Sequence, residues 1–140
     1  MKQKRTLIVV LCIVIAGIAA VALLRNGTSD SRMFASKAQG VIESLRASNY
    51  QDAVKDFNTP LKEAANPQVL GQQWSRIIEK YGPLEEYSII YAGATVNDPS
   101  DIYAVYIKCK FHGITKYLVT KFDRYKQINY LDIRDTPPTR

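Results

Sequence analysis

The sequence predicts an α+β protein in which helices come first along the chain and strands follow. Between Phe34 and Tyr81, apolar residues recur every three or four positions, as in helices with one buried side. After Pro83 they alternate with polar residues, as in strands. An apolar segment precedes both parts. We therefore expect an N-terminal transmembrane helix, then three to four helices packed on one face of a three- to four-stranded antiparallel sheet.

The N-terminal segment Leu7–Leu24 contains no charge, follows three basic residues and is followed by Arg25. As a helix it reaches about 27 Å, close to the ~30 Å hydrocarbon core of a bilayer. The positive-inside rule then predicts a single-pass cell-membrane protein with a cytoplasmic N-terminus and an extracytoplasmic domain. Two alternatives stay open: secretion after cleavage near Ala20-Val21-Ala22, and a buried helix of a soluble protein.

These features divide the chain into five parts. Small, turn-prone residues from Asn26 to Ser31 suit a short tether. The expected parts are a basic cytoplasmic tail at 1–5, the transmembrane helix at 6–25, a linker at 26–32, the external α+β domain at 33–136 and a tail at 137–140.

The net charge of +6 does not predict nucleic-acid binding. Four of the basic residues lie in the first 25 positions, so 15 basic and 13 acidic residues remain after them, a net charge of +2. A nucleic-acid binder shows a concentrated basic stripe on its domain. We expect no nucleic-acid partner.

The two cysteines predict neither a disulfide nor a lipid anchor. Cys12 lies inside the apolar segment, far from Cys109 along the chain. Leu11 stands where a lipobox requires Gly or Ala. Cys109 has the surroundings of a small buried apolar residue rather than of a reactive thiol.

Capping residues and prolines mark the expected helices. Phe34, Ala38, Val41, Ile42 and Leu45 form one apolar stripe. Asn49 can cap a short helix, and helices restart at Thr59-Pro60 and Asn66-Pro67, with Pro suited to the first helical position. The last helix buries a face that ends at Gly82-Pro83. Its members are Val69, Leu70, Trp74, Ile77, Ile78 and Tyr81.

Four strands are expected at about Glu85–Val96, Ile102–Phe111, Ile114–Phe122 and Gln127–Arg134. The turns between them fall at 97–100, His112-Gly113 and 123–126. Short connections make neighbouring strands antiparallel.

The two-residue turn at His112-Gly113 sets the expected register and the two faces of the sheet. It pairs Phe111 with Ile114 and Ile107 with Leu118. The core face then carries Val105, Ile107, Cys109, Phe111, Ile114, Leu118 and Phe122. The outer face carries Tyr106, Lys108, Lys110, Thr115, Tyr117, Val119 and Lys121. A four-residue turn at 97–100 adds Tyr91 opposite Tyr106 and Ile89 opposite Lys108 on the outer face, with Ile90, Ala92 and Val96 on the core side.

Catalytic and metal-binding patterns are not found in the sequence. His112 is the single histidine and lies in a turn, and the neighbouring Glu85 and Glu86 point to opposite sides of a strand. We expect no catalytic residue, no metal site and no cofactor. The one candidate binding face combines aromatic rings with cations, at Tyr91, Tyr106, Lys108, Lys110 and Tyr117. The same pairs also stabilise ordinary sheets, so a purely structural role is the alternative.

Three short motifs resemble a bacterial family of exported domains of unknown function with a cystatin-like, ketosteroid-isomerase-like α+β fold. They are Leu45-Arg46-Ala47-Ser48-Asn49-Tyr50, the Trp74 helix that runs into Tyr81-Gly82-Pro83, and Lys126-Gln127-Ile128-Asn129-Tyr130-Leu131. The resemblance implies helices on a curved antiparallel sheet, sometimes around a pocket, and carries over no catalytic residue.

These observations predict a membrane-anchored, extracytoplasmic, non-catalytic binding or accessory module. Its partners are the membrane, through the N-terminal helix, and either an envelope protein or a small ligand. The alternatives are a pocket-containing small-molecule-binding protein or enzyme of the ketosteroid-isomerase-like fold, and a structural subunit of an envelope assembly.

Overall fold

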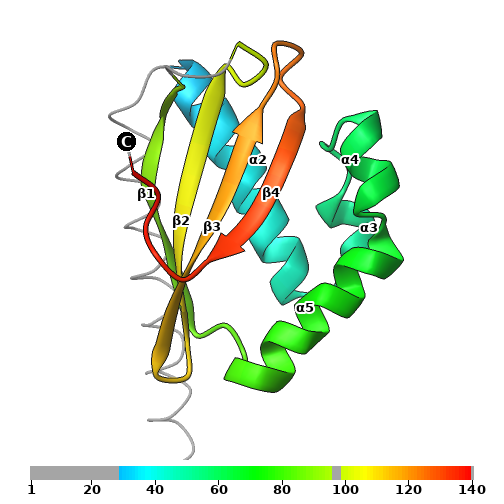
Figure 1. Ribbon diagram of the computed structural model, residues 1–140, viewed down its shortest axis with the longest axis vertical. Coiled ribbons are helices and arrows are strands. Elements are labelled where there is room, and N and C mark those ends of the chain that lie inside the picture. The colour runs from blue at the N-terminus through cyan, green and yellow to red at the C-terminus, as the bar shows by residue number, and fades with distance from the viewer. Residues whose placement is uncertain (1–28, 96–98, 140) are drawn as a thin grey trace, which may run out of the picture.

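A computed structural model describes residues 29–95 and 99–139. The described chain is α+β, with helices α2 (Ser29–Arg46), α3 (Tyr50–Ala53), α4 (Thr59–Ala64) and α5 (Pro67–Tyr81) followed by strands β1 (Glu86–Ala94), β2 (Tyr103–Phe111), β3 (Ile114–Phe122) and β4 (Ile128–Arg134). The strands form one antiparallel sheet in the order β1-β2-β3-β4. Helix α2 crosses one face of this sheet, and α3 and α4 lie beyond β4 (Figure 1).

Helices α3, α4 and α5 begin where the sequence predicts, and asparagine caps explain why. The side-chain oxygens of Asn49, Asn58 and Asn66 accept backbone N–H bonds at the starts of α3, α4 and α5. Helix α4 starts at Thr59, so Pro60 takes its second position rather than the expected first. Gly82, with φ of 83°, ends α5.

Helix α2 begins at Ser29, inside the range 26–32 where a linker is expected. The negative charge of Asp30, in the first turn, interacts favourably with the positive N-terminal end of the helix dipole. The Ser31 hydroxyl bonds the Tyr103 hydroxyl, and this contact joins the first turn of α2 to β2.

The transmembrane segment expected at 6–25 lies outside the described residues. So does Val96, which is expected on the core side of the sheet. Within 29–95 and 99–139, no helix has the length and apolar character needed to cross a membrane.

The predicted register between β2 and β3 is confirmed: Phe111 pairs with Ile114 and Ile107 with Leu118. The core face is correspondingly buried against the helices. Phe34 of α2 stacks on Tyr103 at 4.2 Å between ring centres, and Trp74 of α5 lies 5.9 Å from Phe111. Phe57, Phe111, Phe122, Ile42, Leu45 and Ile107 are the largest fully buried side chains.

The predicted register of β1 is wrong for half of that strand. Tyr91 does pair with Tyr106, but Ile89 pairs with Ile107 rather than with Lys108. A bulge between Ile89 and Tyr91 inserts one extra residue, which exchanges the faces on its N-terminal side. Ile89 is therefore the buried residue, and Ile90, expected on the core side, is 40% exposed.

Candidate functional site

The candidate binding face is assembled as the sequence predicts. Strand pairing places Tyr91 opposite Tyr106 in one row, and Lys108 opposite Tyr117 in the next. Lys110 lies one row further along, opposite Thr115 and Glu86. All five candidates therefore share the outer face, which lies opposite the face that α2 crosses (Figure 1).

Tyr91 and Tyr106 form a stacked pair on this face. Their ring centres are 4.9 Å apart with an angle of 26° between planes. The Tyr91 hydroxyl donates to the Ala94 carbonyl at 3.1 Å, which holds its ring over Gly93. A Cβ at Gly93 would lie 2.6 Å from that hydroxyl, so only glycine allows this position of the ring.

The rings of the outer face cover an apolar centre of its own. Ala104 and Val119 lie on this face by register, yet they are 0% and 1% exposed. Tyr106 and Lys121 are their cross-strand neighbours on β2 and β3. Tyr106 therefore has a structural role, because it is the cross-strand partner of the buried Val119 on a face over which no described helix lies.

The cations of the outer face differ in their partners. Lys110 is 3.4 Å from Glu86, and Lys121 is 3.1 Å from Asp101. Lys108 is exposed and forms no ion pair with any residue that the structure describes. It is thus the candidate residue with a charge still available to a partner.

Strand β4 extends this face with a polar network that the sequence analysis missed. Arg134 donates from Nε to Asp132 at 2.9 Å and from an Nη atom to the Tyr130 hydroxyl at 2.9 Å. The hydrogen bond with Asp132 raises the pKa of Arg134. Lys121 Nζ lies 5.0 Å from the centre of the Tyr130 ring. The alternation of positions 130, 132 and 134 was the sequence signal for this network.

A second missed cluster lies on the core side, where Lys116 is 7% exposed. Its ammonium group bonds the Asp135 carboxylate and donates to the Tyr81 hydroxyl at 3.2 Å. The Asp135 carboxylate raises the pKa of Lys116, and the ammonium lowers the pKa of Asp135. Hydrogen bonds from Lys80 and Lys116 lower the pKa of Tyr81. Because the three groups satisfy one another, the cluster closes the end of the core rather than presenting a free catalytic group.

Cys109 and Tyr87 are not activated for chemistry. Burial raises the pKa of the Cys109 thiol to about 12, as expected for a passive apolar residue. Burial, followed by a hydrogen bond to Glu43, raises the pKa of Tyr87 to about 12. His112 lies in the expected turn, exposed, with Nδ1 3.5 Å from Glu85.

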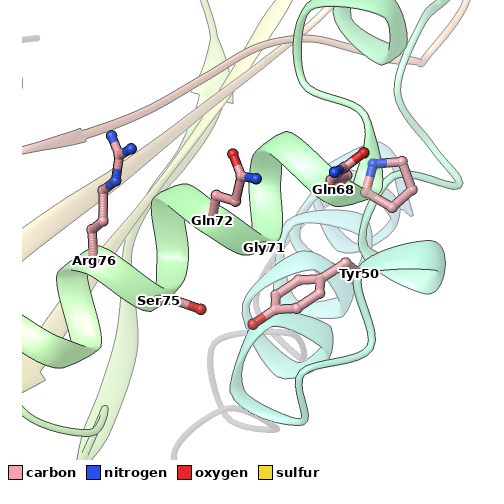
Figure 2. A pocket seen from close by; sticks show the side chains of 7 residues that line it. Tyr50, Gln68, Gly71, Gln72, Ser75 and Arg76 are labelled. Carbon is pink, nitrogen blue, oxygen red and sulfur yellow. The ribbon is translucent and has the colours of Figure 1, made fainter.

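Two shallow grooves flank α5. One, of about 470 Å³, lies around Tyr50, whose ring packs so closely on Gly71 that a Cβ there would be 2.8 Å away. Figure 2 shows Tyr50 on one side of α5 and Gln72 and Arg76 pointing away on the other, so its polar groups do not converge. The other groove, of about 570 Å³, is lined by Trp74, Ile78, Leu84 and the ends of α2 and α5.

The class of protein that the fold defines is an α+β domain whose sheet carries aromatic and basic side chains on the face over which none of the described helices lies. Over 29–95 and 99–139, no three His, Cys, Asp or Glu side chains gather in a way that could hold a metal ion. Neither a family model, nor a curated protein, nor a solved structure matches the chain.

Proposed function

We propose that this protein is a membrane-anchored, extracytoplasmic, non-catalytic binding module that holds an envelope protein on its outer face. The uncharged apolar segment Leu7–Leu24 supports the anchor. The arrangement of α2 on an antiparallel sheet is compatible with the cystatin-like, ketosteroid-isomerase-like resemblance, which is part of the proposal.

The carrying observation is the exposed Lys108, which pairs with Tyr117 in the row next to the stacked Tyr91 and Tyr106. Four cations, Lys108, Lys110, Lys121 and Arg134, share the outer face. The last three are paired with the carboxylates of Glu86, Asp101 and Asp132, which leaves the charge of Lys108 unbalanced. This excess of positive charge favours a protein segment that carries carboxylates. Tyrosine rings add contact area at a small entropic cost, as in other binding surfaces.

A photo-crosslinking residue at Ser88, which pairs with Lys108, tests this binding in cells. We expect one discrete crosslinked envelope protein, whose yield falls when Lys108→Gln removes the charge. Lys62→Gln is the matched control, because Lys62 is an exposed lysine on α4. Equal yields from both variants would contradict a role for Lys108, and absence of any product would contradict the binding face.

Anchoring and orientation are tested by a reporter fused after Arg140. We expect activity only in a reporter that works outside the cytoplasm, together with membrane fractionation of the full-length chain. Activity of a cytoplasmic reporter would overturn the orientation, and a released, shortened chain would favour secretion after cleavage.

The groove beside Trp74 favours a second candidate, a small-molecule-binding protein. Apolar side chains line its floor, while Arg46 and Glu79 supply charges. Quenching or shifting of the emission of Trp74, the single tryptophan, by an apolar anionic probe such as a fatty acid would support this candidate. Unchanged emission at saturating probe would count against it.

A further inference from the structure

The turn between β3 and β4 is held rigidly by its own hydrogen bonds. The Asp123 carboxylate accepts the N–H groups of Tyr125 at 2.9 Å and Gln127 at 3.1 Å. The Lys126 N–H donates to the Asp123 carbonyl at 2.9 Å, and Lys126 adopts a φ of 62°. The turn therefore presents its side chains from a fixed backbone.

This turn exposes an aromatic ring flanked by cations. Tyr125 is 70% exposed, more than any other large apolar side chain in the described ranges. The Arg124 guanidinium lies 5.2 Å from its ring centre. Ile102, 39% exposed, adds apolar surface nearby, because its N–H donates to the carbonyl of Phe122 just before the turn.

The same turn packs beside the point where the chain enters the domain. Lys37 of α2 donates to the Lys126 carbonyl at 2.7 Å, and Lys126 Nζ is 3.9 Å from Asp30. Figure 1 shows this turn and the start of α2 at one end of the molecule, with the turn between β2 and β3 at the other. The turn that carries Tyr125 is thus held beside the first two turns of α2, which begins at Ser29.

The distance from Ser29 to the expected membrane segment is short. Residues 25–28 alone separate Leu24 from Ser29. A chain rising at most ~3.6 Å per residue covers about 18 Å over these five steps. The end of the domain that carries Tyr125 therefore lies within reach of the bilayer surface, if Leu7–Leu24 spans it as the proposed function requires.

We propose that the Arg124-Tyr125-Lys126 turn, together with the start of α2, docks on anionic phospholipid headgroups of the outer surface of the membrane. The proposal rests on the membrane anchor of the proposed function. Tyrosine is favoured at the level of the headgroups, where its ring meets apolar surface and its hydroxyl meets water. Arginine and lysine supply the charge that attracts anionic lipids.

The charges that face this surface support an anionic occupant. Arg124 forms no ion pair with the acids of the described chain. The neighbouring acids are engaged elsewhere: Asp123 accepts backbone N–H groups of the turn, Asp56 lies 3.8 Å from Lys37, and Asp30 lies 3.9 Å from Lys126 Nζ. Arg124 is consequently the group available to lipid phosphates.

The test reconstitutes the full-length chain in phosphatidylcholine vesicles with about 30% phosphatidylglycerol, an anionic lipid. Tryptophan replaces the exposed tyrosine in one variant (Tyr125→Trp) and the exposed histidine of the opposite turn in the control (His112→Trp). A headgroup nitroxide lipid quenches emission, and the wild-type signal of buried Trp74 is subtracted. We expect at least about two-fold stronger quenching at position 125 than at 112, since β3 separates the two turns by roughly 30 Å.

Further variants and lipids distinguish the outcomes. Arg124→Gln in the Tyr125→Trp chain lowers the quenching, and so does phosphatidylcholine alone, if charge contributes as proposed. Equal quenching at positions 125 and 112 in a chain that floats with the vesicles overturns the headgroup contact and leaves the anchor intact. A chain that does not float overturns the anchor, and the headgroup contact with it.

Discussion

The two faces of the sheet use the same four strands in different ways. On the core face, side chains such as Ile107, Phe111 and Leu118 are 0% exposed because helices cover them. On the outer face no described helix lies over the strands, yet Ala104 and Val119 are 0% and 1% exposed there. Burial under a layer of helices therefore stabilises the fold, whereas the outer face keeps charged side chains such as Lys108 exposed to a partner.

The largest expected effect is on the core face. Phe111→Ala removes a ring that lies 5.9 Å from the Trp74 ring and 6.5 Å from the Tyr81 ring. We expect a loss of about 3–5 kcal/mol in the free energy of unfolding, from lost burial and the cavity left behind. Urea unfolding measured by circular dichroism checks this value. A loss below about 1 kcal/mol would contradict the view that burial on the core face stabilises the fold more than burial on the outer face.

A smaller effect is expected when an outer-face ring is removed. Tyr106→Ala loses the stack with Tyr91 and uncovers Val119, which should cost about 1–2 kcal/mol in the same unfolding assay. Tyr106→Phe keeps the ring and should stay within about 0.5 kcal/mol of the wild type. If Tyr106→Ala costs as much as Phe111→Ala, burial on the outer face contributes as much to stability as burial under the helices.

The smallest effect concerns the charge at the edge of the core face, and it depends on pH. Lys116 lowers the pKa of Asp135, so the ionised carboxylate stabilises the folded chain. This contribution is complete above the unfolded pKa of about 3.9 and is lost as the pH falls through the lower folded pKa. We expect Asp135→Asn to unfold at a lower temperature than the wild type at pH 7, with the difference shrinking below about pH 4.

Glu63→Gln is the control for this pH dependence. Glu63 is an exposed acid on α4 that forms no ion pair with another described residue. Across the pH series, the unfolding temperature of Asp135→Asn should approach that of the wild type as the pH falls, whereas Glu63→Gln should show no such change. A pH-independent difference for Asp135→Asn would mean that the carboxylate does not act through its charge.

Local signals predicted most of the elements and the candidate face. The His112-Gly113 turn has two residues, so it set the pairing of β2 and β3 and with it the positions of Tyr106, Lys108, Lys110 and Tyr117. The asparagine and proline pairs likewise located the helix starts. Such features act over a few residues and can be recognised without the rest of the chain.

The misses have a common physical origin in contacts between distant residues. The bulge at Ile90 fits β1 to β2. The adjacent Ile89 and Ile90 interrupt the alternation of the strand there, but they do not tell which of the two faces the core. The cluster around Lys116 brings together β3, the end of α5 at Tyr81 and the segment after β4 at Asp135, which are separated along the chain. Val119 lies on the outer face by register and is nevertheless buried, which the alternation of the strand does not predict.

The sequence by itself determined the class of the fold, the order of helices and strands, the faces of β2 and β3, and the charge balance of the domain, because these depend on periodicity, caps and composition. Only the tertiary structure decided which charges remain unpaired, where an apolar residue is covered, and that the Tyr125 turn lies beside the start of α2. Those properties depend on which distant side chains share a surface, and that is set by packing rather than by neighbours along the chain.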